Sequence, residues 1–94
     1  MKTITIQIGN SDNKLSQEDW SAFAIEVNQL IDNNAANVHF FGCPPAWLPW
    51  QNIAWVIQFD DAVVEENFKK RLTEIRQKYE QDSVAWTEGE TQFI

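Results

Sequence analysis

The predicted fold is decided by one stretch of the chain, Ile53-Ala54-Trp55-Val56-Ile57-Gln58-Phe59-Asp60-Asp61. Large apolar residues alternate with smaller ones from Ile53 to Phe59, and this period of two is typical of a strand. Asp60 and Asp61 follow at once and can cap the first turn of a helix. The stretch therefore predicts a strand that leads directly into a helix.

The residues after Asp61 carry the pattern of an amphipathic helix. Acidic residues come early in this segment and basic residues come late, an order that complements the helix dipole. The apolar positions recur at steps of three and four residues and form one stripe: Val64, Phe68, Leu72, Ile75 and Tyr79.

A similar strand and helix precede this pair. Isoleucines alternate with polar residues over Thr3–Ile8, and turn formers fill Gly9–Asn13. Ser16 with Asp19 three residues on is a variant of the capping box, and Asn33 and Asn34 are plausible C-terminal breakers. The helical stripe between them consists of Trp20, Phe23, Ala24, Val27, Leu30 and Ile31.

Two further strands complete the pattern. The short aromatic run Val38–Phe41 predicts one, and Ser83–Thr87 predicts the other, with a bend at Gly89 and a continuation over Thr91–Ile94. The segment Gly42–Gln51 is expected to be a loop, because its three prolines oppose regular strand pairing.

The predicted order of strand, helix, strand, strand, helix, strand resembles the ferredoxin-like split βαβ arrangement. The resemblance is one of topology over nearly the whole chain. It implies an α+β domain spanning residues 1–94, with two helices on one face of a four-stranded antiparallel sheet and Thr3–Ile8 and Ile53–Phe59 at its centre. The opposite, open face would carry Thr3, Thr5, Gln7, Ala54, Val56, Gln58, Ala85 and Thr87. Many unrelated activities use this fold, so the resemblance implies little about function.

Composition limits the function classes. The chain has 94 residues, with 7 Lys and Arg against 14 Asp and Glu, and a net charge of −7. This balance argues against binding to a nucleic-acid backbone. The sequence shows no apolar run long enough to span a membrane and no secretory signal, so we expect a cytoplasmic protein.

Catalytic and metal-binding motifs are weak. His39 and Cys43 lie on a strand and in a loop, two ligands cannot close a zinc site, and a nucleophilic Cys43 would lack an orienting third group. The paired acids Asp60-Asp61, Glu65-Glu66 and Glu88/Glu90 are explained by helix caps and solvated surface. We therefore expect no enzyme, no metal and no cofactor.

The loop between Cys43 and Gln51 is the most unusual feature, with Trp47, Leu48, Pro49 and Trp50 in succession after a proline pair. Three interpretations stay open. The loop can cap one end of the core, it can line a small-molecule pocket, or it can anchor a partner protein, since Trp is enriched at binding hot spots.

The function that we expect is that of a small acidic protein-binding module, an inhibitor or regulator of the immunity or anti-defence type. It would occupy a partner's surface through the Trp/Pro loop, with Glu18, Asp19, Glu88 and Glu90 complementing a basic partner. One alternative is a small-molecule-binding or enzymatic dimer with an aromatic pocket. A second is a self-assembling subunit that uses Thr91–Ile94. A homodimer is compatible with each. The candidate pocket residues are Trp47, Trp50, Trp55, His39 and Tyr79.

Overall fold

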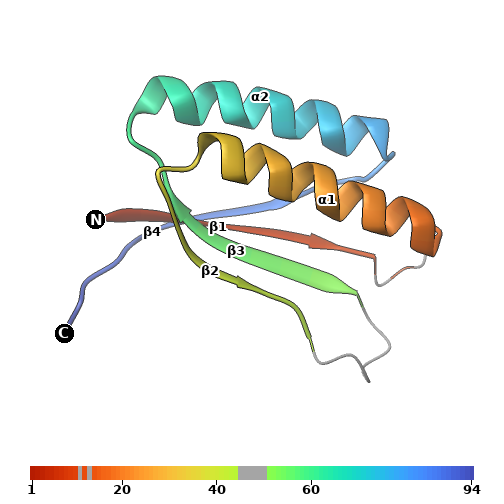
Figure 1. Cartoon of the computed structure of the whole chain (residues 1–94), viewed down its shortest axis with the longest axis horizontal. Helices are drawn as coiled ribbons and strands as arrows, with labels where there is room; N and C mark the ends of the chain where they lie inside the picture. The colour runs from red at the N-terminus through yellow and green to blue at the C-terminus, as the bar shows by residue number, and fades with distance from the viewer. Residues whose placement is uncertain (11, 13, 45–50) are drawn as a thin grey trace.

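The computed structural model describes residues 1–10, 12, 14–44 and 51–94. Four strands and two helices alternate in the predicted order (Figure 1). Their bounds are β1 Lys2–Gly9, α1 Gln17–Asn34, β2 Asn37–Gly42, β3 Asn52–Gln58, α2 Ala62–Lys78 and β4 Ala85–Glu90.

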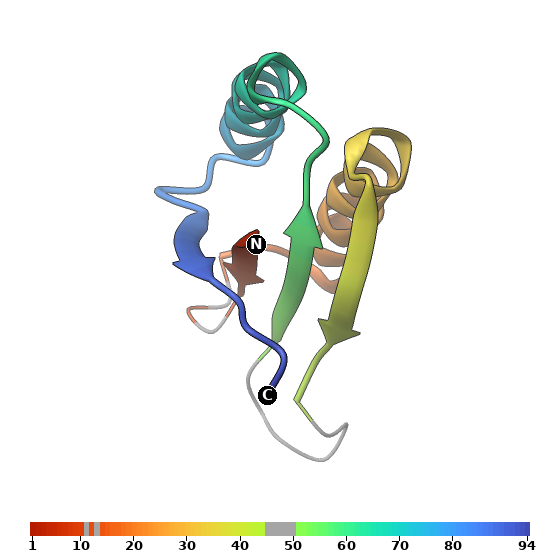
Figure 2. The ribbon, with the colours of Figure 1, turned by 90° about the vertical axis from the view of Figure 1, so that its left-hand side faces the viewer.

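The strands form one antiparallel sheet in the order β2-β3-β1-β4. The predicted central strands are therefore confirmed, and β2 and β4 are the edges. Both helices cover the same face of the sheet, with α1 on the β2 side and α2 on the β4 side (Figure 2). The ferredoxin-like arrangement is confirmed, and the other face of the sheet is left open.

Both helices begin where the caps predict. The Ser16 hydroxyl accepts a hydrogen bond from the amide of Asp19 at 3.1 Å, and the Asp61 carboxylate accepts one from the amide of Val64 at 2.9 Å. Each cap satisfies a backbone donor that the helix itself leaves unpaired.

The core lies between the helices and the sheet. Trp55 is 1% exposed, and its indole N–H donates to Oδ1 of Asn28 in α1 at 3.0 Å. Ile53, Val84 and Trp86 are only partly buried and pack against its margin. The buried apolar residues are Ile4, Ile6, Ile8, Trp20, Phe23, Val27, Leu30, Ile31, Trp55, Ile57, Phe68 and Leu72.

The last strand differs from the prediction. β4 runs through Gly89, which pairs with Thr3, instead of bending there. The predicted continuation over 91–94 is not a strand. The amide of Thr91 donates to the carbonyl of Met1 at 2.8 Å, and the Thr91 hydroxyl lies 2.7 Å from that of Thr3. Thr3 is buried although it belongs to the open face.

One buried polar side chain ties the ends of three elements together. Asn10 is 1% exposed. Its side-chain NH₂ donates to the main-chain carbonyl of Leu15 and to Oε1 of Gln51. Its Oδ1 accepts a hydrogen bond from the main-chain N–H of Leu15. Gln51 in turn donates to Gln17 at the start of α1. The Asn10 side chain therefore links the end of β1 to the starts of α1 and β3.

Replacing Asn10 by Ala is expected to lower the free energy of unfolding by about 2 to 3 kcal/mol, because it leaves partners on Leu15 and Gln51 without a hydrogen bond. Urea unfolding followed by tryptophan fluorescence measures the change. Asn33→Ala, at an exposed position of α1, is the matched control. Equal midpoints for the two variants would contradict the assigned role of Asn10.

Candidate functional site

The predicted anchor residues Trp47, Leu48, Pro49 and Trp50 lie outside the described residues. The flanking Cys43 is exposed and carries a free thiol.

Two of the four acids proposed for partner contact are engaged within the chain. Glu88 lies 3.5 Å from Nζ of Lys2 and 3.9 Å from Nζ of Lys69, and it accepts a hydrogen bond from the Trp86 indole at 3.1 Å. The pKa of Glu88 is held below its usual value, mainly by the hydrogen bond from the Trp86 indole and further by the charges of the two lysines. Glu90 pairs with the amino group of Met1. These two charges are therefore already balanced by cations.

The other two acids, Glu18 and Asp19, are exposed in the first turn of α1. Among the described residues neither forms an ion pair. Figure 1 shows this turn at the opposite end of the molecule from the end of β4. The structure therefore does not bring the four acids into one patch.

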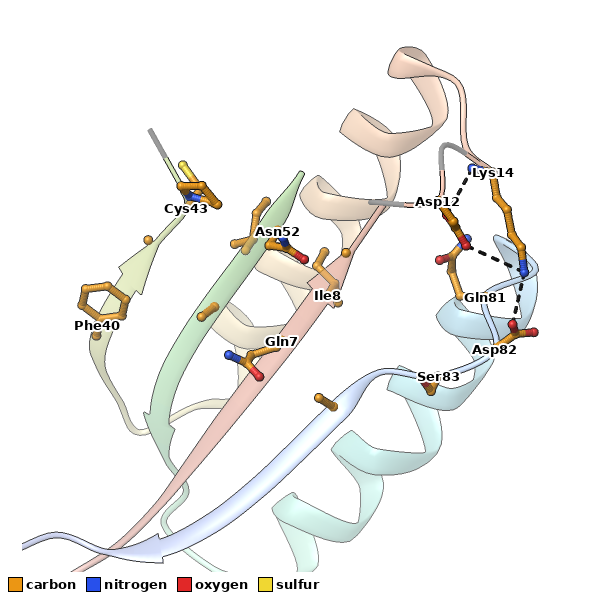
Figure 3. A pocket seen from close by; sticks show the side chains of 16 residues that line it. Gln7, Ile8, Asp12, Lys14, Phe40, Cys43, Asn52, Gln81, Asp82 and Ser83 are labelled. Atoms are coloured by element: carbon orange, nitrogen blue, oxygen red, sulfur yellow. Dashed lines mark hydrogen bonds and ion pairs between the residues drawn. The ribbon is translucent and has the colours of Figure 1, made fainter. Parts of the chain in front are cut away.

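A hollow lies on the open face of the sheet, toward the end where β1 finishes (Figure 3). Its floor is a row of residues that crosses all four strands: Gly42 faces Ala54, Ala54 faces Gln7, and Gln7 faces Ala85. Three of these four residues have little or no side chain. The floor is consequently lower than the next row of the sheet, which contains Phe40 and Val56.

Two close approaches shape the wall and one end of this hollow. The ring of Phe40 lies over Gly42, where a β-carbon would come within 2.5 Å of its Cζ. A β-carbon at Gly9 would lie equally close to Oδ1 of Asn52. Both glycines are needed for these side chains to lie flat against the sheet. The resulting cavity measures about 730 Å³, within the usual range for small-molecule sites.

The charged groups of the hollow are confined to one side. Nζ of Lys14 lies 3.1 Å from Asp82 and 3.8 Å from Asp12. The hydrogen bond to Asp82, and then the charges of both acids, raise the pKa of Lys14. This exposed group carries one net negative charge and leaves the uncharged amides of Gln7 and Asn52 facing the remaining space (Figure 3).

The reactive side chains do not form a catalytic pair. Nε2 of His39 lies 3.2 Å from Oε1 of Gln58. Four residues of extended chain separate it from Cys43, a distance of roughly 13 Å. Across residues 1–10, 12, 14–44 and 51–94, no group of three His, Cys, Asp or Glu side chains is placed to hold a metal ion. In the same part of the chain, no helix is long and apolar enough to cross a membrane.

The described members of the predicted aromatic pocket lie in three different places. Trp55 is in the core, His39 is on the exposed edge strand, and Tyr79 lies between the two helices. Tyr79 donates to the carboxylate of Glu26 in α1, which also accepts from Lys78 at 2.9 Å. The hydrogen bond to Glu26 is the main cause that raises the pKa of Tyr79 to about 12. This cluster joins α1 to α2 and does not line the hollow on the open face.

The second notable surface is the edge strand β2. Val38, Phe40 and Phe41 are exposed by 44%, 55% and 57%, and no residue of this strand is charged. Edge strands are usually protected by charge, proline or a covering element. The helix-side neighbour of Phe41 is Trp55, with ring centroids 5.6 Å apart.

A β-bulge alters the faces of β2. The register passes from Val38 opposite Ile57 directly to Phe40 opposite Val56, so that His39 is the extra residue. His39 contacts Gln58 on the open face, where Phe40 also lies. The sequence prediction placed Gln7, Ala54 and Ala85 on this face, but it missed the exposed Phe40 and the contribution of Gly42 to the floor.

The α1 surface nearest β2 is also uncharged at its centre. Asn28 faces Trp55 of the sheet, and Ser21, Ile25 and Asp32 share its side of the helix by their spacing. Ile25 is 56% exposed. The acid Glu26 points instead toward α2, where Lys78 and Tyr79 hold it.

Comparison with known proteins supports the fold alone. No family model matches the chain, and no curated protein matches it. A dimeric ferredoxin-like protein of unknown function from Thermobifida fusca is similar over 95% of this chain and 90% of its own, with a TM-score of 0.60 and 10% identity. Hydroxynitrile lyase from Passiflora edulis matches over 99% and 97%, with a TM-score of 0.58 and 13% identity. The C-terminal domain of MgtC from Mycobacterium tuberculosis matches over 95% and 88%, with a TM-score of 0.58 and 12% identity.

Tyr79 is the only tyrosine of the chain, which makes its titration directly measurable. Ultraviolet absorbance should show ionisation near pH 12 in the native protein, and Glu26→Gln should lower this pKa toward the ordinary value of 10.0. The stabilisation by this contact is complete between pH 4.5, the ordinary pKa of Glu26, and pH 10. It is lost as the pH rises through 12 and, at the acid end, as Glu26 is protonated. Glu18→Gln is the control and should leave the titration unchanged. An unaltered Tyr79 pKa in Glu26→Gln would contradict the contact.

Proposed function

We propose that this chain is a non-enzymatic protein-binding module that receives an extended strand of a partner protein along β2. The observation that carries the proposal is an uncharged edge strand with three large apolar side chains in solvent. An added strand would bond to the main-chain edge of β2, which no other described strand occupies, and its side chains would cover those of β2 on both faces. Affinity would come from main-chain hydrogen bonds and specificity from the side chains.

The surroundings of β2 support this assignment. Ile25 and Val38 extend the apolar surface along α1 and the helix side of the sheet. Glu18 and Asp32 stand at the two ends of the same side of α1. An apolar centre with a polar rim is the usual anatomy of a protein interface. An inhibitor or regulator that occupies a partner's surface fits this arrangement.

Phe41→Lys should abolish partner binding, because it sets a charge in the centre of the proposed interface. The folding cost should be about 1 kcal/mol, since the ring is half-exposed. The matched control is Val63→Lys on α2, which also replaces an exposed apolar residue, here 71% exposed, by lysine. Tagged forms of the native chain and both variants are used to capture partners from a lysate of the source cells.

The supporting outcome is a stoichiometric protein retained by the native chain and by Val63→Lys but absent from Phe41→Lys. Thermal unfolding must show that Phe41→Lys remains folded. If all three forms capture the same proteins in the same amounts, β2 is not the binding surface.

A second candidate function, binding of a small molecule, is favoured by the hollow on the open face. Its size, its small-residue floor and the amides of Gln7 and Asn52 suit a flat, uncharged or cationic ligand. The side chain of Ala85 forms one end of the floor.

Ala85→Leu should weaken a ligand of the hollow by roughly tenfold or more, because it fills part of the floor. Thr87→Leu lies two residues further along the same face, outside the hollow, and is the control. A fragment screen by NMR, read at the amides of Gln7 and Asn52, supplies the probes. Binding that is equal in both variants would place the ligand elsewhere, and a screen without hits would remove this candidate.

A further inference from the structure

We infer that the strand received by β2 is the β2 strand of a second copy of this chain, paired antiparallel about a two-fold axis between His39 and Phe40. The inference rests on the proposed function, because it names the partner of the same surface. It follows from the charge of the chain, from the face pattern of β2 and from the adjoining side of α1.

The charge of the chain restricts where two copies can meet. Each copy carries a net charge of −7, so like charges oppose most approaches. β2 contains no Lys, Arg, Asp or Glu from Asn37 to Gly42, so self-pairing there places none of these side chains opposite each other. The beginning of β4, the other edge of the sheet, is also uncharged, but β4 ends with Glu88 and Glu90.

The bulge gives β2 a face pattern that is the same in both directions. On the helix side lie the second and the fifth residues of the strand, Val38 and Phe41. The other four face the open side: Asn37, His39, Phe40 and Gly42. The pattern is therefore the same when it is read from either end. In an antiparallel pair, residues directly opposite each other must point to the same face. Pairing over the whole strand meets this condition at every position.

The facing residues in this register are chemically compatible. Val38 lies opposite Phe41 of the second copy on the helix side, and Phe40 lies opposite His39 on the open side. Asn37 lies opposite Gly42. A shift of one residue would set Asn37 opposite Phe41 and send their side chains to different faces. The full-length register is therefore specified by the strand itself.

The helices tolerate the same approach. Continuing the sheet through β2 brings the β2 sides of both α1 helices toward the two-fold axis, since α1 covers this side of the sheet (Figure 2). The central residues on that side are Ser21, Ile25 and Asn28, none of which is charged. Ile25, 56% exposed in one copy, gains an apolar neighbourhood in the pair.

Sedimentation equilibrium of the native chain is expected to give about twice the 10.9 kDa of one copy. Phe41→Lys should reduce the mass to that of a single chain, and Val63→Lys should leave it doubled. Circular dichroism confirms that each variant is folded.

Disulfide trapping tests the register. The cysteine variants Val38→Cys and Phe41→Cys, and the control Val63→Cys, each also carry Cys43→Ser. Each chain therefore has a single thiol, the introduced one. Val38→Cys and Phe41→Cys should each stay uncrosslinked alone, because neither position faces itself. Mixed together under oxidised glutathione, they should form a covalent heterodimer on a non-reducing gel, since residues 38 and 41 face each other. Val63→Cys mixed with Phe41→Cys is the control and should not crosslink.

The outcomes separate this inference from the proposed function. A native chain that stays monomeric, yet captures a different protein that Phe41→Lys loses, overturns the second copy and leaves the strand-binding function standing. If Phe41→Lys alters neither the mass nor the captured proteins, both are overturned. A dimer that survives Phe41→Lys, or a mixture of the two cysteine variants that does not crosslink, places the self-contact elsewhere.

Discussion

The end of the sheet that borders the hollow depends on the hydrogen bonds of one buried side chain, the Asn10 amide. Its partners on Leu15 and Gln51 fix where β1 stops, where α1 starts and where β3 enters the sheet. A primary amide suits this position because it donates and accepts at once, and a buried amide without partners would be costly. Two of the strands that border the hollow, β1 and β3, are held in place from this one side chain.

The extra residue His39 in the edge strand β2 determines which side chains this strand presents on each face of the sheet. A regular strand would send His39 and Phe40 to different faces, whereas the bulge sends both to the open face. Bulges commonly protect an edge by twisting it away from neighbours. Here the strand also lacks charge and proline, so that the twist is its only described protection, and the exposed rings of Phe40 and Phe41 remain available on both faces.

Local physics explains which parts of this structure the sequence predicts. Caps such as Ser16 and Asp61 act within one helical turn, and the alternation over Ile53–Phe59 acts between neighbouring residues, so short windows contain the information. The burial of Asn10 depends on Gln51, 41 residues away, and its surroundings resemble any turn. The bulge at His39 depends on pairing with β3, and the straight course of β4 through Gly89 depends on Thr3. The hollow is equally hard to predict from short windows of sequence, because its floor combines residues from all four strands.

The two candidate surfaces share one strand, and this shared strand links their functions. Phe40 forms a wall of the hollow, while Phe41 packs against Trp55 on the helix side. An added strand binds the main-chain edge between these faces and therefore leaves the floor at Ala54 open. In the pairing that we infer, Asn37 of the second copy lies opposite Gly42, at the rim of the hollow, and brings a side-chain amide that one copy lacks there. Pairing through β2 would then complete the hollow, because its outer wall would come from the second chain.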